Sequence, residues 1–521
     1  MRKFRHPPIS QDEFRSTHAI PKSRQVEISL IISDEEQDLQ NYDSEIRRLQ
    51  HAITDLEAGR RALQEQVERR RSYLSVLRRV PEELWVEIFS HLLGHLQTLA
   101  TENELERIRQ EGEWRRLFKA PFTLSHVCAH WREIVIFTPS LWSHIYINLH
   151  WWHPTRAAEL YLERSREQGL DIALYCSRRW DPTIAEQQRV NGAGTFQALI
   201  SHMARFRRLS MFDLQFEAEQ PRNPTFSRLE HLHIGKSFYP PWFREAVRHA
   251  PRLDKVVMEH SAITPFKMIS YSSLRSLEIL KLERYAEQFL EALPTLRNLE
   301  SLTITRFADS LRQPILPPTK CESLRHLSIT HYSNSPASLL QSIDLSDLQS
   351  LTIDFQRPFD SLADVITTLS TLRSLQTLVL SFFVPHPLDR LVNIIRDLPN
   401  LTVLETRLRL YSPSFIPAVS SFFSDLAEMS TLCSQLESLS LTVVHVDITE
   451  EILESFTRMV ESRAQGGTPA LRDVRLVGDF PYALPLPSDI VSRLRASQAE
   501  GVHCSVKNPA EYCYFPPNIR I

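Results

Sequence analysis

Histidine and cysteine side chains are considered first, because they hold metal ions and act as nucleophiles. His126, Cys128 and His130 fall close together on a predicted helix, and His231 and His233 alternate on a predicted strand. A structural zinc site needs four ligands, usually in paired Cys-x-x-Cys or His-x-x-x-His spacings. No further ligands accompany either group in such spacings. The sequence therefore predicts no metal site.

The motifs of nucleophilic and phosphate chemistry are absent from the sequence. It contains no Gly-x-Ser-x-Gly turn, no Gly-x-x-x-x-Gly-Lys-Ser/Thr loop and no ordered set of Ser, His and Asp. Glycine lets backbone amides approach a phosphate closely, yet it occurs only 11 times in 521 residues, where average usage would give about 35. We therefore expect no catalytic residue and no cofactor, and a binding protein rather than an enzyme.

Charge and cysteine usage limit the partners and the compartment. The 60 Lys and Arg nearly balance the 63 Asp and Glu, which gives a formal net charge of -3 and favours neither nucleic acid nor a membrane surface. The six cysteines are scattered, as is typical of reduced thiols. No segment has the roughly 20 apolar residues that span a bilayer, and residues 1–33 lack a signal-peptide run. We expect a cytoplasmic or nuclear protein.

A heptad pattern occupies the N-terminal region. Ser33–Glu36 fits a capping box, which predicts a helix start there after a flexible tail over residues 1–33. From Leu39 to Leu77, seam positions recur in steps of three and four, and ten of the twelve are apolar, the exceptions being Arg60 and Arg70. This pattern is typical of a coiled coil over residues 34–79. Two interpretations stay open: a homodimer through Leu39 to Leu77, or a single helix lying against its neighbouring domain.

Two short amphipathic helices are predicted after the heptads. The first begins at Pro81, a residue suited to the first helical position, and places Leu84, Ile88 and Leu92 on one face. The second lies within residues 121–134 and is followed by the sequence Pro-Ser-Leu-Trp. Two short helices cannot bury their apolar faces alone. We therefore expect these faces to contact something else.

The ordered residue types of this region resemble the F-box, with its Leu-Pro-x-Glu-Leu, Ile-Phe, Leu and Val-Cys-x-x-Trp-Arg elements. The matching residues are Pro81, Glu83, Leu84, Ile88, Phe89, Leu92, Val127, Cys128, Trp131 and Arg132. The trailing Pro-Ser-Leu-Trp is similar to F-box proteins of fungi. The resemblance implies a small all-α module over residues 80–142 that binds a Skp-family adaptor and, through it, a cullin. The adaptor contacts that it implies are Pro81, Leu84, Ile88, Leu124, Val127 and Trp131.

The region departs from the F-box pattern at two points. Val80 stands where leucine is usual, and residues 93–120 form a longer connection than the ordinary one. Within that connection, Glu102–Phe118 is highly charged with a few apolar residues, which predicts an inserted surface helix. The alternative interpretation of the whole region is an ordinary helical hairpin packed on the following domain.

A Leu-x-x-Leu-x-Leu/Ile pattern recurs through the rest of the chain. Nine copies start at 21- to 27-residue intervals, and two more follow at 35-residue intervals, close to the roughly 20 to 29 residues of leucine-rich repeats. Helical stretches separate the copies. The pattern predicts an α/β leucine-rich-repeat solenoid over residues 143–521, because such units are stable only when stacked. The copies start at Phe206, Leu229, Leu253, Leu274, Leu299, Leu324, Leu348, Leu375, Leu401, Leu436 and Leu471.

The lead-in to the repeats should close the end of the sheet. Strands are predicted at His144–Leu149 and Leu170–Cys176, with a helix at Thr155–Glu167 between them. A repeat array needs such an atypical terminal unit to cover its exposed edge.

The residues between the repeat leucines should face the inner surface of the solenoid, because side chains alternate along a strand. Arg208, His231, His233 and Lys255 gather basic and imidazole groups on the early repeats. They predict a surface for a protein substrate with acidic or phosphorylated residues. The alternative interpretation is that they are ordinary solvated strand residues.

The F-box resemblance and the repeats together imply a substrate-recognition subunit of an SCF-type cullin ubiquitin ligase. Such a protein brings its substrate close to chemistry that its partners perform. The alternative is a leucine-rich-repeat scaffold or adaptor protein with no ligase role.

Overall fold

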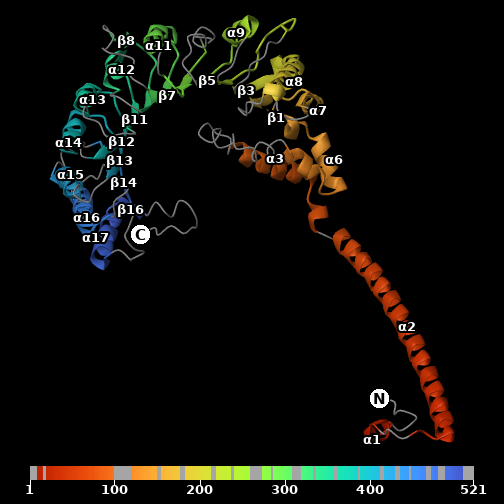
Figure 1. Cartoon of the computed structure of the whole chain (residues 1–521). Coiled ribbons are helices and arrows are strands. Elements are labelled where there is room, and N and C mark those ends of the chain that lie inside the picture. The colour runs from red at the N-terminus through yellow and green to blue at the C-terminus, as the bar shows by residue number, and fades with distance from the viewer. Residues whose placement is uncertain are drawn as a thin grey trace. The chain divides into compact units, whose positions relative to one another are not determined.

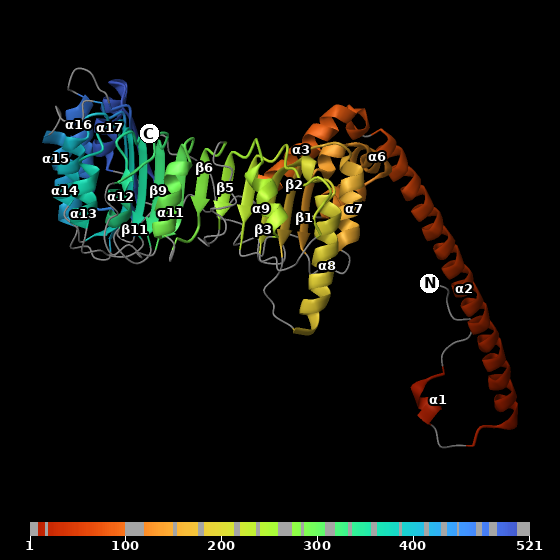
Figure 2. The ribbon, with the colours of Figure 1, turned by 90° about the horizontal axis from the view of Figure 1, so that it is seen from above.

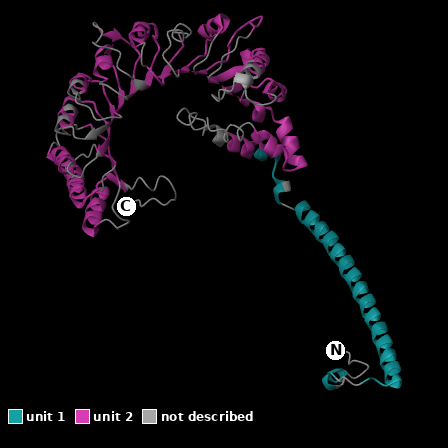
Figure 3. Cartoon of the chain, viewed as in Figure 1, with its two compact units in different colours: residues 1–85 teal, residues 86–521 magenta. Residues whose placement is uncertain are grey.

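The computed structural model covers the whole chain (Figure 1). It divides into two compact units, residues 1–85 and 86–521 (Figure 3). The structure describes residues 9–15, 19–74, 76–98, 119–148, 154–175, 182–212, 219–235, 240–258, 273–282, 286–307, 318–331, 336–355, 362–384, 388–410, 416–428, 435–444, 448–464, 471–478 and 487–507.

The first unit is dominated by one long helix. A short helix α1 (Gln11–Arg15) precedes α2 (Lys22–Tyr73), and a 3-10 turn η1 (Val76–Arg79) follows. The predicted start at Ser33 is wrong, since α2 begins at Lys22, and the predicted tail over residues 1–33 is helical in its last part. Pro21 explains the true start, because proline is tolerated at a helix N-terminus but not inside. No residue of the 52-residue α2 is buried.

A small group of helices opens the second unit. Helix α3 (Glu82–Thr98) runs across the boundary between the units, and residues 119–125 form another helical segment. Helix α6 (Ala129–Phe137) and a 3-10 turn η2 (Pro139–Trp142) follow. The predicted inserted helix at Glu102–Phe118 lies outside the described residues.

A parallel sheet of fourteen strands runs through the described residues of the second unit. Its strand order follows the chain, β1-β2-β3-β4-β5-β6-β7-β9-β11-β12-β13-β14-β15-β16, and each adjacent pair is parallel. A separate two-stranded sheet pairs β8 (Thr319–Lys320) with β10 (Ile343–Asp344). The strands of the large sheet are β1 His144–Asn148, β2 Leu170–Tyr175, β3 Phe206–Phe212, β4 His231–Ile234, β5 Lys255–Met258, β6 Ser276–Ile279, β7 Ser301–Phe307, β9 His326–His331, β11 Ser350–Phe355, β12 Thr377–Val384, β13 Val403–Leu410, β14 Ser438–Val444, β15 Asp473–Gly478 and β16 His503–Lys507.

All eleven copies of the repeat pattern contribute a strand, from β3 to β15. The two lead-in strands, β1 and β2, also lie where the sequence predicts them, with β1 at the edge of the sheet. Strand β16 and its preceding helix were not predicted, because the last segment lacks the leucine spacing. The prediction of an α/β fold with a long N-terminal helix is confirmed.

Helices connect most of the successive strands in the described residues, as parallel pairing requires a crossover between them. Within the second unit the helices that follow β1 lie along one side of the sheet, and we call its other side the open face (Figures 1 and 2). The helices of this side are α7 Pro154–Ser165, α8 Pro182–Ile200, α9 Pro241–Arg248, α11 Ala286–Ala292, α12 Ala337–Gln341, α13 Leu362–Leu369, α14 Leu388–Asp397, α15 Ile416–Glu428, α16 Glu450–Ala464 and α17 Ser488–Ala499, with 3-10 turns η3 Met203–Arg205 and η4 Leu293–Thr295.

The repeat leucines form the core of the second unit. Leu302, Leu351 and Leu378 are fully buried, while the serine and threonine residues beside them on the same strands are half-buried. Burying one such leucine contributes roughly 1.5–3 kcal/mol. The alternation separates an apolar row under the helices from a polar row on the open face.

Trp142 ties the small helical group to the start of the sheet. Its indole N–H donates to the carbonyl oxygen of Val135 over 2.7 Å, and its ring lies edge-on to Phe122 and Tyr161 at centroid distances of 5.3 and 5.1 Å. The Arg164 guanidinium lies 4.3 Å from the ring centroid. Because Tyr161 and Arg164 belong to α7, the helical group and the first strand-helix unit share one core.

Candidate protein-binding surfaces

Helix α3 carries two apolar stripes that differ in burial. Trp85, Phe89 and Leu93 recur at steps of four and are 5%, 1% and 8% exposed. Leu84, Ile88 and Leu92 form a second stripe, one residue earlier at each turn, and each is 49% exposed. We call this second stripe the α3 ridge. A helix that buries one apolar stripe and leaves another half-exposed is expected to contact a further partner through the second.

The start of α6 packs against the buried stripe of α3. The Trp131 ring meets Phe89 edge-on at a centroid distance of 4.9 Å. Cys128 caps α6, because its Sγ accepts the backbone N–H of Trp131 at 3.4 Å. Val127, immediately before the cap, is 58% exposed. From the sequence, Cys128 was considered as a weak metal-ligand candidate and as part of the F-box pattern, and its capping role was not predicted.

The predicted adaptor contacts differ in how far their side chains are exposed. Pro81, Leu84, Ile88 and Val127 are exposed, and Trp131 is half-buried. Leu124 is a correction, since it is only 7% exposed and belongs to the core of the helical group. Its spacing from Val127 resembles a surface position, but the helical segment over residues 119–125 turns it inward. Leu92 was not among the predicted contacts, although it continues the ridge.

Three of the four predicted substrate contacts lie in one row on the open face. Arg208, His231 and Lys255 are paired in register on the adjacent strands β3, β4 and β5. Burial lowers the pKa of His231, and the charges of Arg208 and Lys255 lower it further. The imidazole is therefore mostly neutral at pH 7. The Lys255 ammonium lies 3.8 Å from a carboxylate oxygen of Glu278, so its charge is partly balanced.

His233 is the second correction among the predicted site residues. It is 7% exposed, and its ring lies edge-on to Phe212 at a centroid distance of 4.5 Å. Phe212 ends the neighbouring strand β3 and covers the imidazole. His233 is therefore part of the packing, and Arg208 is the more accessible cation of the predicted group.

An ionic group at the start of the sheet was missed by the sequence analysis. Arg207 donates two hydrogen bonds to the Asp171 carboxylate, at 2.9 and 2.6 Å, and His144 Nε2 lies 3.2 Å from the same group. Burial by itself would raise the pKa of Asp171, but the hydrogen bonds from His144 and Arg207 lower it to about 2. His144, Asp171 and Arg208 share a row by register. Extending the strand alternation into the lead-in strands would have found them.

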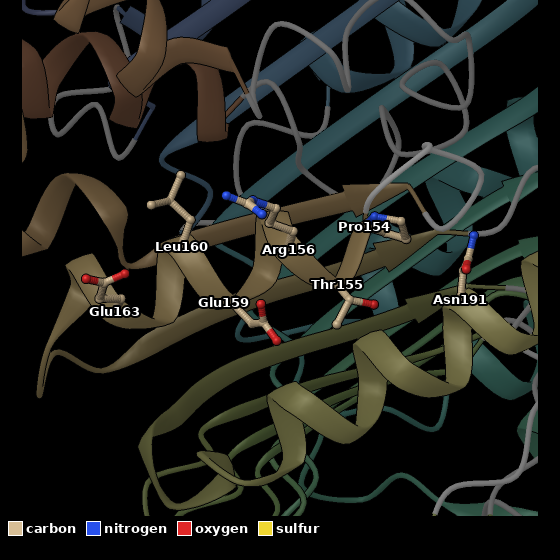
Figure 4. A pocket seen from close by; sticks show the side chains of 7 residues that line it. All are labelled: Pro154, Thr155, Arg156, Glu159, Leu160, Glu163 and Asn191. Atoms are coloured by element: carbon tan, nitrogen blue, oxygen red, sulfur yellow. The ribbon is translucent and has the colours of Figure 1, made fainter.

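A polar depression lies on the helix side, between α7 and α8 (Figure 4). The hydroxyl of Thr155 meets that of Thr195 at 3.0 Å beneath it. The lining carries two carboxylates and one guanidinium, and it contains no histidine, cysteine or serine. It therefore provides charged contacts to a ligand. The lining residues are Pro154, Thr155, Arg156, Glu159, Leu160, Glu163 and Asn191.

Two further properties concern the described residues alone. No three or more of their His, Cys, Asp and Glu side chains come together in a way that would hold a metal ion. None of their helices combines the length and the apolar character needed to cross a bilayer.

Comparison with known proteins gives no family assignment: no family model matches the chain, and no curated protein matches it.

Proposed function

We propose that the chain is the substrate-recognition subunit of an SCF-type cullin ubiquitin ligase. Residues 80–142 would act as an F-box that binds a Skp-family adaptor, and the sheet would bind a protein substrate. The observation that carries this proposal is the α3 ridge, whose three aliphatic side chains are each 49% exposed while the neighbouring stripe of the helix is buried.

The physical argument rests on what the ridge gains when it is covered. Fully burying one leucine or isoleucine contributes roughly 1.5–3 kcal/mol, and half of each ridge side chain is still exposed. Covering the ridge and the nearby exposed Val127 would therefore supply several kcal/mol of apolar contact to a partner. Three of these four residues, Leu84, Ile88 and Val127, are among those that the F-box resemblance assigns to the adaptor surface.

The second part of the proposal is that the parallel sheet is a leucine-rich-repeat solenoid. The support is the recurrence of the leucine pattern at 21 to 27 residues, together with a strand order that follows the chain. In such an array each unit contacts its neighbours and leaves one polar face for a ligand. Arg208 on β3 gives that face an accessible cation for an acidic or phosphorylated segment.

In this proposal the protein performs no chemistry of its own and acts in the cytoplasm or the nucleus. Its role is to hold a substrate near a ubiquitin-transferring partner, which raises the local concentration of the reacting groups. The shared core around Trp142 suits that role, because it fixes the helical group against the first strands of the sheet.

The test is quantitative capture of a purified Skp-family adaptor by the full chain. The variant Leu84→Ala/Ile88→Ala removes two ridge side chains. Its matched control is Val26→Ala/Leu30→Ala, which removes two aliphatic side chains at the same spacing from α2 positions outside the heptad seam, at 62% and 64% exposure. We expect the ridge variant to weaken adaptor binding by roughly tenfold or more, since central apolar contacts cost about 2 kcal/mol when truncated. The control should bind like the wild type.

A second candidate function is a leucine-rich-repeat scaffold without a ligase role. The length of α2 and the absence of any buried residue in it favour this candidate, since such a helix suits assembly. The two functions separate in the same experiment. A wild-type chain that does not bind the adaptor supports the scaffold and contradicts the ligase subunit.

A further inference from the structure

Helix α2 has an apolar seam that is exposed among the described residues of the first unit. The seam side chains from Leu39 to Val67 are between 37% and 74% exposed, with Val67 the least and Leu56 the most exposed of the apolar ones. Most helices in water depend on packing of one face for their stability. The heptad positions also extend further back than the sequence analysis placed them, through Ile32 to Ile28.

Charged residues interrupt the seam, and they decide the orientation of a partner helix. Glu35, Arg60 and Arg70 occupy seam positions. In a parallel in-register dimer each seam residue faces its own copy, so that Glu35 would meet Glu35 and each arginine would meet the same arginine. These three like-charge layers would be partly desolvated and unfavourable.

We propose that α2 forms an antiparallel two-stranded coiled coil with a second copy of the chain, with Arg60 of each copy facing Glu35 of the other. In this register five further layers are apolar. They pair Ile46 with Leu49, Tyr42 with Ile53, Leu39 with Leu56, Ile32 with Leu63 and Ile28 with Val67. Arg70 faces Gln25, so that no like-charge layer is left.

The neighbouring antiparallel registers, displaced by one heptad, lose this complementarity. They place Arg60 opposite Ile28 or Tyr42, and Glu35 opposite Ile53 or Val67. Each would leave a charge against an apolar side chain, which is costly in a partly buried seam. The proposed register also overlaps the two helices from end to end, because Lys22 of one copy lies level with Tyr73 of the other.

The orientation has a consequence for assembly. A helix of 52 residues at 1.5 Å per residue is about 78 Å long. In the antiparallel dimer the two C-terminal ends of α2 therefore lie about 78 Å apart, whereas a parallel dimer would place them side by side. This inference stands apart from the ligase proposal, since it concerns only α2.

Charge exchange tests the register. In sedimentation equilibrium of the full chain, Arg60→Glu and Glu35→Arg should each weaken the dimer by about tenfold or more, because two seam contacts change from attraction to repulsion. The double variant Glu35→Arg/Arg60→Glu should restore the wild-type constant to within about threefold. The matched control Arg61→Glu changes a neighbouring outward position and should have little effect. A monomeric wild type, or a double variant as weak as the singles, overturns the proposal.

Cysteine cross-linking tests the orientation without relying on charge. Leu39→Cys and Leu56→Cys chains are mixed, oxidised and digested, and the linked peptides are identified by mass spectrometry, which separates them from those of the six native cysteines. The antiparallel dimer predicts a bond between position 39 of one chain and position 56 of the other. Bonds joining position 39 to itself or 56 to itself indicate the parallel dimer and contradict the proposal. The absence of any bond at these positions contradicts it as well.

Discussion

The indole N–H of Trp142 donates to the carbonyl oxygen of Val135 over 2.7 Å, across seven residues of chain. This bond folds η2 back onto α6 and places the indole ring between Phe122 and Tyr161. A polar group that is fully buried must find such a partner, because leaving it unsatisfied costs about 1–3 kcal/mol. The relationship joins the helical group to the first unit of the sheet.

Replacing Trp142 should therefore weaken the packing between the helical group and the first strand-helix unit of the sheet. We expect Trp142→Ala to lower the free energy of unfolding of this region by about 3–5 kcal/mol, since it removes a fully buried ring. Trp142→Phe keeps much of the ring but leaves the Val135 carbonyl without its donor, and should cost about 1–2 kcal/mol. Denaturant unfolding followed by hydrogen exchange measures both. Phe137→Ala, at a 61% exposed ring nearby, is the control, and an equal loss there would contradict the prediction.

Neighbouring residues of α3 should have opposite roles. Phe89→Ala should destabilise the helical group by about 3–5 kcal/mol, because the ring is buried against Trp131. Ile88→Ala, on the half-exposed ridge, should cost less than about 1 kcal/mol in stability but weaken adaptor binding. Thermal unfolding and adaptor binding, measured on the same preparations, separate the two effects. If Ile88→Ala destabilises the protein as strongly as Phe89→Ala, then the ridge belongs to the core.

The ionic group around Asp171 should make the free energy of unfolding depend on pH. Its pKa of about 2 lies below the ordinary value for aspartate, so the ionised carboxylate favours the folded state. This contribution is fully present above about pH 4 and is lost as the pH falls toward 2, and it amounts to about 2 kcal/mol. Asp171→Asn should therefore be less stable than the wild type at pH 7, with the difference shrinking below pH 4. Asp347→Asn, an exposed control, should show no such convergence.

One arginine, Arg493, links the last described helix, α17, to the preceding helix α16. Arg493 of α17 donates two hydrogen bonds to Glu461, at 2.7 and 2.6 Å, and one to Glu454 at 2.7 Å, both on α16. The Arg493 side chain is about one-third exposed, so solvent screens the group and its contribution should be about 1 kcal/mol. We expect Arg493→Ala to speed amide exchange in α17 by about fivefold. Arg493→Lys should speed it less, because lysine keeps the charge but loses the paired hydrogen bonds. Exchange unchanged from that of the exposed control Arg495→Ala would contradict this role.

Periodic features of the fold could be predicted from the sequence, whereas features that depend on three-dimensional neighbours could not. The leucine spacing places the eleven strands of the large sheet from β3 to β15, because strand residues with buried side chains repeat once per unit. The start of α2 was misplaced at Ser33, since a capping box inside a long helix is indistinguishable from one at its start. Strand β16 was missed because His503, Ser505 and Lys507 alternate with few leucines.

The candidate surfaces show the same division. Periodicity placed Leu84 and Ile88 on one face, and the structure leaves that face half-exposed. It could not show that Leu124 turns inward or that Phe212 covers His233, because burial depends on residues distant in the sequence. The ionic group of His144, Asp171 and Arg207 joins three strands: strand alternation extends to His144 and Asp171, but it does not identify Arg207 as their partner.

The central claim is that a Skp-family adaptor covers the exposed surface around α3 and Val127, and Cys128 offers the most direct test. This exposed thiol directly follows Val127. Its alkylation rate in the full chain is measured by mass spectrometry with and without saturating adaptor, with the buried Cys504 as an internal reference. The proposal predicts that the adaptor slows alkylation of Cys128 by about tenfold or more, as expected for a buried interface position. An unchanged rate with the adaptor present in excess would contradict it.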